Sequence, residues 1–141
     1  MIVLCFDGSP ESRHAIELAA KVLEDRDAVV VDVAEALMVG EDAALTPGVD
    51  VAALAGLNRA ATHERVEAGV ALAQEHGFRA VGRVISAAPT GDGIRQIADE
   101  VDASVIVAGS RHRSGLRRVL EGSVPAALAE HATRPVLLIP S

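Results

Sequence analysis

Five short apolar runs set the strongest limit on what this chain can fold into. They comprise residues 2–6, 28–33, 80–85, 104–108 and 135–139. Most of them are continuous in Val, Ile and Leu instead of alternating with polar residues, which is typical of parallel strands buried on both faces. Helical patterns lie between the runs, and strand-helix-strand units cross over with a right hand. We therefore predict an α/β fold with three layers, α/β/α, in which helices cover both faces of an open five-stranded parallel sheet.

The first helical pattern carries its own start signal. Ser9 is a residue type favoured at helix N-caps, and Pro10 is well tolerated at the first helical position. The apolar positions that then repeat at helical spacing are Ala15, Ile16, Ala19, Val22 and Leu23. Three more helices are predicted: residues 51–75 with Val66, Val70 and Ala73, residues 92–101 with Ile94, Ile97 and Val101, and residues 123–131 with Ala127 and Leu128.

Length and composition limit the class of protein. A chain of 141 residues, 50% of them hydrophobic, predicts a single domain over residues 1–141 with one core. Phe6 and Phe78 are its only aromatic residues and its formal net charge is -7, so it lacks the stacking platforms and the basic surface of a nucleic-acid binder. No apolar stretch approaches the ~18 residues of a membrane span, and no secretory signal precedes the first run. We expect a cytoplasmic protein that binds neither nucleic acid nor membrane.

Neither the cysteine nor the histidines indicate a disulfide, a reactive thiol or a metal site. Cys5 is the one cysteine, which excludes an internal disulfide and a multi-cysteine metal site, and its place inside the first strand predicts a buried, inert thiol. The histidines show no paired ligand spacing, so we expect no metal site built by the protein itself.

An arginine cluster is the strongest candidate for a ligand-binding segment in this acidic chain. Four arginines fall within residues 111–118, among glycines, between the fourth strand and the start of the last helix. Glycines let backbone N–H groups approach an anion, arginines supply charged donors, and a helix start adds partial positive charge. An arginine cluster alone is more often a solvated surface loop. The position of this segment in the fold is what favours an anionic ligand, above all a phosphate.

A second segment is expected to meet that cluster. In open α/β sheets, ligands bind outside the carboxyl ends of the strands, where the winding direction reverses. If the first and fourth strands are neighbours, Asp7, Gly8 and Ser9 lie in the same crevice as the loop of residues 109–122. Asp7 is either an acceptor for a ribose hydroxyl or metal, or a turn former with Gly8.

These segments together resemble the universal stress protein family over the whole chain. The family motif is Gly, two residues, Gly, nine residues, Gly, then Ser or Thr; Gly109, Gly122 and Ser123 match it, whereas His112 replaces the second glycine. Pro125 also stands where nucleotide-binding members tend to carry Ser or Thr. The resemblance implies an adenine nucleotide alpha hydrolase-like fold with strand order 3-2-1-4-5.

The resemblance also implies a ligand. It places Asp7 near a ribose, the backbone of Val33 near adenine, and the loop with Ser123 and Val124 around the phosphates. The full set of candidate binding residues is Asp7, Gly8, Ser9, Val33, Ala108, Gly109, Arg111, His112, Gly115, Gly122, Ser123 and Val124. The implied ligand is ATP or a related adenine nucleotide such as AMP, with Mg²⁺ accompanying it.

We therefore expect a regulatory stress-response protein that binds an adenine nucleotide. No general base is visible, so we expect no catalytic residue and at most slow ATP hydrolysis that needs Mg²⁺. Two alternatives stay open. One is a nucleotide-free dimeric interaction module of the same fold, which His112 and Pro125 favour. The other is a flavin or nicotinamide protein, although Gln96 stands where a fingerprint beginning at Gly91 needs its third glycine.

The last apolar run predicts a homodimer. Its residues Val136, Leu137, Leu138 and Ile139 are flanked by Pro135 and Pro140, which suits the edge of a sheet. An edge strand this apolar must be shielded from solvent and from other strands. A second copy of the chain that pairs with it across a two-fold axis would shield it. The resemblance to the family implies dimers through the same strand.

Overall fold

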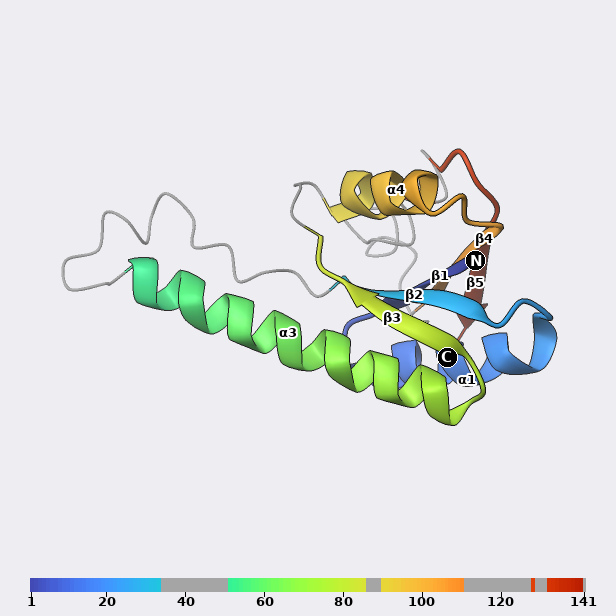
Figure 1. Ribbon diagram of the computed structural model, residues 1–141, viewed down its shortest axis with the longest axis horizontal. Helices are drawn as coiled ribbons and strands as arrows, with labels where there is room; N and C mark the ends of the chain where they lie inside the picture. The colour runs from blue at the N-terminus through green and yellow to red at the C-terminus, as the bar shows by residue number, and fades with distance from the viewer. Residues whose placement is uncertain (34–50, 86–89, 111–127, 129–131, 141) are drawn as a thin grey trace.

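The computed structural model describes residues 1–33, 51–85, 90–110, 128 and 132–140 (Figure 1). Its sheet has five parallel strands in the order β3-β2-β1-β4-β5. The strands are β1 (Ile2–Phe6), β2 (Asp27–Asp32), β3 (Arg79–Arg83), β4 (Val105–Ser110) and β5 (Val136–Pro140), and the helices are α1 (Pro10–Val22), α3 (Val51–Glu75) and α4 (Thr90–Glu100). The predicted fold class and strand order are confirmed.

Strand β1 lies at the centre of the sheet and pairs on both sides. Ile2 to Phe6 pair in register with residues 28–32 of β2, so that Phe6 lies beside Asp32. On the other side, Ile2 pairs with Val105 of β4. The chain winds outward from β1 to β2 and β3 in one direction and to β4 and β5 in the other. The winding therefore reverses between β1 and β4, as the ligand-crevice argument requires.

Two apolar cores lie on opposite faces of the sheet. Ile2, Leu4 and Phe6 pack into the core beneath α1 and α3. Val3 and Cys5 pack into the other core, against α4. Figure 1 shows the same division, with α4 on one side of the sheet and α1 and α3 on the other. Because successive strand residues point to opposite faces, burial of both faces requires the continuous apolar run seen in the sequence.

Helix boundaries match the sequence patterns with one correction. Ser9 caps α1, whereas Val22, one of the apolar positions at helical spacing, is 63% exposed and lies outside the buried face. Helix α4 begins at Thr90, earlier than predicted, so Gly91 lies within it. Leu128 is helical and buried in the α4 core, while the rest of the predicted helix 123–131 lies outside the described residues.

Helix α3 approaches the sheet very closely at two glycines. A Cβ on Gly69 would stand 2.8 Å from both Phe6 Cδ1 and Val30 Cγ1. In β3, a Cβ on Gly82 would stand 2.2 Å from Val66 Cγ1. The helix can lie directly on β1, β2 and β3 only because these positions carry no side chain. Its amino-terminal half extends past the sheet in Figure 1, and Leu57 there is exposed.

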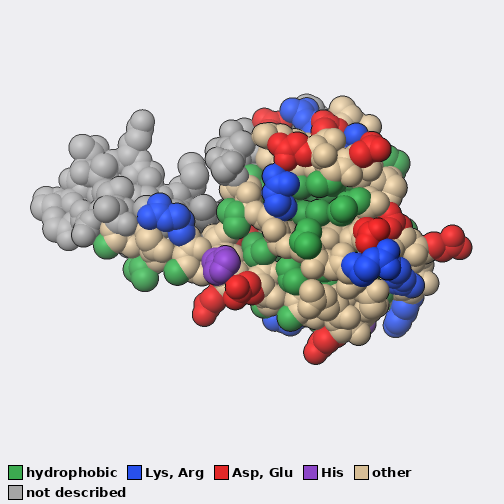
Figure 2. Space-filling view, in the orientation of Figure 1, with side chains coloured by type: hydrophobic (Ala, Val, Ile, Leu, Met, Phe, Trp, Pro, Cys, Tyr) green, Lys and Arg blue, Asp and Glu red, His purple; other side chains and the backbone are tan. Residues whose placement is uncertain are grey.

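The surface of the described part shows few special features. In Figure 2, hydrophobic side chains show between charged ones on the face that carries β3. Val81 and Val84 of this edge region are 57% and 50% exposed. Within the described ranges, no helix is both long enough and apolar enough to span a membrane.

Alanine substitutions at the two glycines of α3, Gly69 and Gly56, should change the free energy of unfolding in opposite directions. Gly69→Ala forces a methyl group against Phe6 and Val30, both fully or almost fully buried, and should lower the free energy of unfolding by about 1–3 kcal/mol. Gly56→Ala meets no atom within 4 Å and should raise it by up to about 1 kcal/mol through helix propensity. Urea unfolding of the two variants measures both. A stabilising Gly69→Ala would contradict the packing described for α3.

Candidate functional site

The turn after β1 is held by its own side chains. The amide N–H of Ser9 donates to Oδ1 of Asp7 at 2.9 Å, and Ser9 Oγ accepts from the amide of Ser12 at 3.2 Å. Gly8 between them has φ of +81°, a conformation that other residues adopt only at a cost. Asp7 therefore fills the turn-forming role considered from the sequence. A carboxylate can accept several hydrogen bonds.

The end of β4 lies against the first turn of α1. A Cβ on Gly109 would stand 2.7 Å from the carbonyl oxygen of Glu11, so the helix can approach this strand only at a glycine. Ala108, one residue earlier, has its side chain buried in the α4 core, which leaves only its backbone for a ligand. The structure thus brings the turn of residues 7–9 and the end of β4 together.

Val33 follows β2 directly and continues the pairing with β1. Its amide N–H donates to the carbonyl oxygen of Phe6 at 2.9 Å. This bond places Val33 beside the end of β1, at the same edge as Asp7 and Gly8. Because the N–H is already engaged, the backbone group with which Val33 can recognise a base is its carbonyl oxygen, an acceptor.

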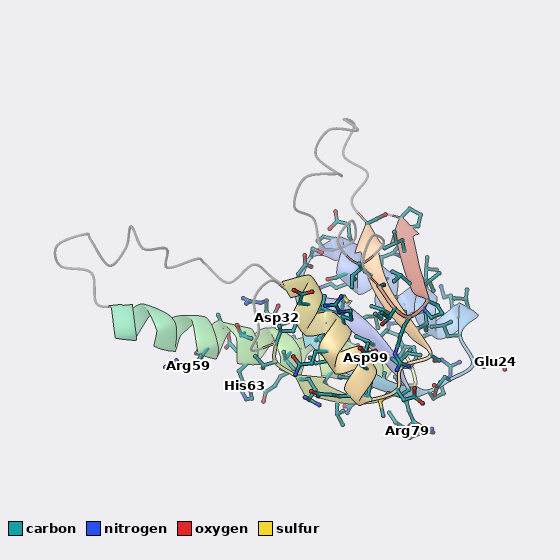
Figure 3. The ribbon with its side chains drawn as sticks, turned by 90° about the horizontal axis from the view of Figure 1, so that it is seen from above. Glu24, Asp32, Arg59, His63, Arg79 and Asp99 are labelled. Carbon is teal, nitrogen blue, oxygen red and sulfur yellow. The ribbon has the colours of Figure 1, made fainter. Side chains whose placement is uncertain are left out.

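A buried ion pair that the sequence analysis missed stands at the same edge. Asp32, labelled in Figure 3, has a side chain only 3% exposed. Nε of Arg65 donates to its two carboxylate oxygens at 3.3 and 3.1 Å, and Nη2 donates to Oδ2 at 2.9 Å. The Arg65 Cδ lies 3.8 Å from the position that a Cβ on Gly8 would take. A lone acid that ends a buried strand is the signal that could have revealed the pair, because a buried carboxylate requires a partner.

Half of the predicted binding residues lie outside the described residues. These are Arg111, His112, Gly115, Gly122, Ser123 and Val124. Of the described ones, Asp7, Gly8, Ser9, Val33 and Gly109 meet at the carboxyl edge of β1, β2 and β4. Across the parts of the chain that are described, no three His, Cys, Asp or Glu side chains gather in a way that could hold a metal ion.

The match to known proteins covers almost the whole chain. The profile of the Universal stress protein family matches residues 1–140. This chain belongs to that family. The fold described above is the one found in solved universal stress proteins, and no curated protein matches the sequence.

Three solved structures illustrate the likeness. A protein of the universal stress protein family from Burkholderia pseudomallei is 26% identical, with a TM-score of 0.63 and coverage of 99% of this chain and 95% of that one. The universal stress protein from Archaeoglobus fulgidus in complex with dAMP is 22% identical, with a TM-score of 0.65 and coverage of 98% and 95%. A family protein from Arabidopsis thaliana with AMP bound is 16% identical, with a TM-score of 0.59 and coverage of 99% and 90%.

Cys5 of this universal stress protein is buried, as predicted, and should be chemically silent. Burial, with a smaller contribution from the charge of Asp7, raises the pKa of its thiol to about 12. At pH 8 only roughly one thiol in ten thousand would be the reactive thiolate. A disulfide reagent such as dithiobis-nitrobenzoate should leave the native protein unmodified and label it in urea. Equally fast labelling with and without urea would contradict the buried strand.

Proposed function

We propose that this universal stress protein binds ATP or a related adenine nucleotide at the carboxyl edge of β1 and β4 and acts as a regulatory module. One observation carries the proposal: the turn of residues 7–9, the end of β4 and Val33 meet where the winding of the sheet reverses. The family members from Archaeoglobus fulgidus and Arabidopsis thaliana, solved with dAMP and with AMP, support the choice of ligand.

Each described residue has a defined task in this proposal. The carbonyl oxygen of Val33 accepts a hydrogen bond from the exocyclic amine of adenine. Asp7 keeps its bond to Ser9 and also accepts a hydrogen bond from a ribose hydroxyl. Gly8 and Gly109 contribute backbone without side chains that would obstruct the crevice. An acceptor at Val33 favours a base with an amino group and disfavours one with a carbonyl at that position.

The phosphates belong to the segment that carries the arginine cluster. Arg111, His112 and Gly115 would line them, and Gly122, Ser123 and Val124 would offer backbone donors at a helix start. Mg²⁺ would enter together with ATP and offset its charge. His112 and Pro125 depart from the family motif and weaken this half of the site, which is why a nucleotide-free interaction module is the competing function.

Dimerisation through β5 is the second part of the proposal. Strand β5 ends the sheet, pairing with β4 on one side, and Leu138 is 38% exposed. Ile139 and Leu137 instead pack into the core beneath α1 and α3. Two copies that pair through their β5 edges would satisfy the outward backbone groups and cover Leu138.

Binding and base preference test the nucleotide site together. Titration calorimetry should show saturable binding of ATP with Mg²⁺, weaker at high salt because charge contributes to it. Adenosine should bind about tenfold more tightly than inosine, because the base carbonyl of inosine would face the carbonyl oxygen of Val33.

The phosphate half of the site is tested by substitution. Gly122→Val should abolish ATP binding and leave thermal unfolding unchanged. Absence of heat at millimolar ATP would favour the nucleotide-free module, and so would heat-denatured protein that releases no nucleotide.

Light scattering tests the dimer. Leu138→Lys places like charges next to each other across the two-fold axis without entering a core, so it should convert dimer to monomer. Val81→Lys is the matched control, because Val81 is an exposed valine on the opposite edge strand and should leave the dimer intact. Wild-type protein that scatters as a monomer at high micromolar concentration would refute the proposal.

A further inference from the structure

The ion pair between Asp32 and Arg65 places a planar cation next to the position proposed for the base. Asp32 is the residue before Val33, whose carbonyl is proposed to meet adenine. Nε and Nη2 of Arg65 donate hydrogen bonds to the Asp32 carboxylate at distances from 2.9 to 3.3 Å. Thr62 Oγ1 accepts a longer hydrogen bond from Nη2 at 3.4 Å. The guanidinium group is therefore fixed both in place and in orientation.

The carboxylate accepts hydrogen bonds along one edge of the guanidinium, so these bonds lie in the plane of the group and not on its faces. Nε and Nη2 form the edge turned to Asp32, whereas Nη1 lies on the side of Cδ, the atom of Arg65 closest to a Cβ on Gly8. The Arg65 side chain is 30% exposed although its partner is 3% exposed. Arg65 thus reaches from a buried carboxylate to the surface beside the turn after β1.

A purine ring at this edge has no exposed Phe, Tyr or Trp ring to stack on. Phe6 and Phe78 are the only residues of these three types in the chain, and both are buried, at 0% and 3% exposure. A guanidinium plane stacks well on aromatic rings and is less strongly hydrated than an ammonium group. Among the described side chains, Arg13 and Arg65 carry planar cationic groups near the ends of β1 and β2. The Arg13 guanidinium lies 5.7 Å from the centre of the Phe6 ring, whereas that of Arg65 is paired with Asp32, the residue before Val33.

We propose that the face of the Arg65 guanidinium packs against the adenine base, with Asp32 as the residue that orients it. The inference rests on the proposed nucleotide site and assigns a recognition role within it. A phosphate contact is the less favoured role, because the Asp32 carboxylate already neutralises the guanidinium. In addition, Arg65 pairs with Asp32, the last residue of β2, whereas the arginine cluster follows β4 in the sequence.

The substitution Arg65→Lys keeps the positive charge and removes the planar guanidinium group. Lysine can keep the ion pair with Asp32, so the fold should persist, but it has no plane to stack on. Affinity for adenosine and affinity for ATP, measured by calorimetry, should fall by the same factor, about five- to tenfold. The double variant Asp32→Asn, Arg65→Gln removes both charges together and avoids an unpaired buried carboxylate; it should show the same equal losses.

Arg79→Lys is the matched control. Arg79 also pairs with an aspartate of β2, with Nε 2.7 Å from Oδ1 of Asp27, but at the amino end of the strands. This change should leave both affinities as in the wild type. It therefore separates a local effect at Arg65 from a general loss of arginine.

The outcomes are distinguishable. Unchanged adenosine affinity in both Arg65 variants would overturn the stacking role while leaving the proposed nucleotide site standing. A loss confined to ATP would overturn it as well, since it would mark Arg65 as a phosphate contact. A wild-type protein that binds neither ligand would instead remove the proposed function on which the inference rests.

Discussion

Burial of β1 on both faces is the constraint on which the rest of the structure depends. Each of its residues is at most 3% exposed, and they alternate between the core beneath α1 and α3 and the core beneath α4. A strand buried in this way must be flanked by β2 and β4, since its backbone groups need partners on both edges. The carboxyl end of β1 then opens at the switch point, where Asp7 and Gly8 leave the sheet.

Close packing shapes the edge around that point. Gly109 lets the first turn of α1 lie on β4, and Gly69 lets α3 lie on β1 and β2. These contacts hold both helices near the carboxyl edge, so Arg65 of α3 can reach Asp32 and pass beside Gly8. The ion pair is thus a consequence of how closely the helix approaches the sheet. The same packing that stabilises the fold arranges the candidate site.

Much of the fold could be predicted from the sequence, because its strongest signals are local. Continuous apolar runs marked the five strands, and Ser9 with Pro10 marked the start of α1. The exposure of Val22 was not predicted, because helical spacing alone does not tell how wide the buried face of a helix is. The predicted dimer and the single domain stay predictions, as do the six candidate residues from Arg111 to Val124.

The candidate site was predicted only in part, because tertiary contacts leave weak traces in a sequence. Gly109 was predicted from the family motif as a binding residue, and its close packing against the first turn of α1 was not foreseen. Asp32 and Arg65 are 33 positions apart, and nothing in the spacing of a strand and a helix shows that their ends meet. The sequence can show that the buried Asp32 needs a partner, but only the arrangement of α3 over β2 identifies Arg65 as that partner.

Backbone amide chemical shifts recorded while AMP is added report directly on whether a nucleotide binds at the carboxyl edge of β1 and β4. A site at this edge predicts that the largest shifts fall on residues 7–9, on Val33 and on residues 109 and 110, with little change at Asp27 and Arg79 at the opposite end of the sheet. Shifts that cluster at the amino ends of the strands or along the exposed edge of β3, or no shifts at all, would contradict it.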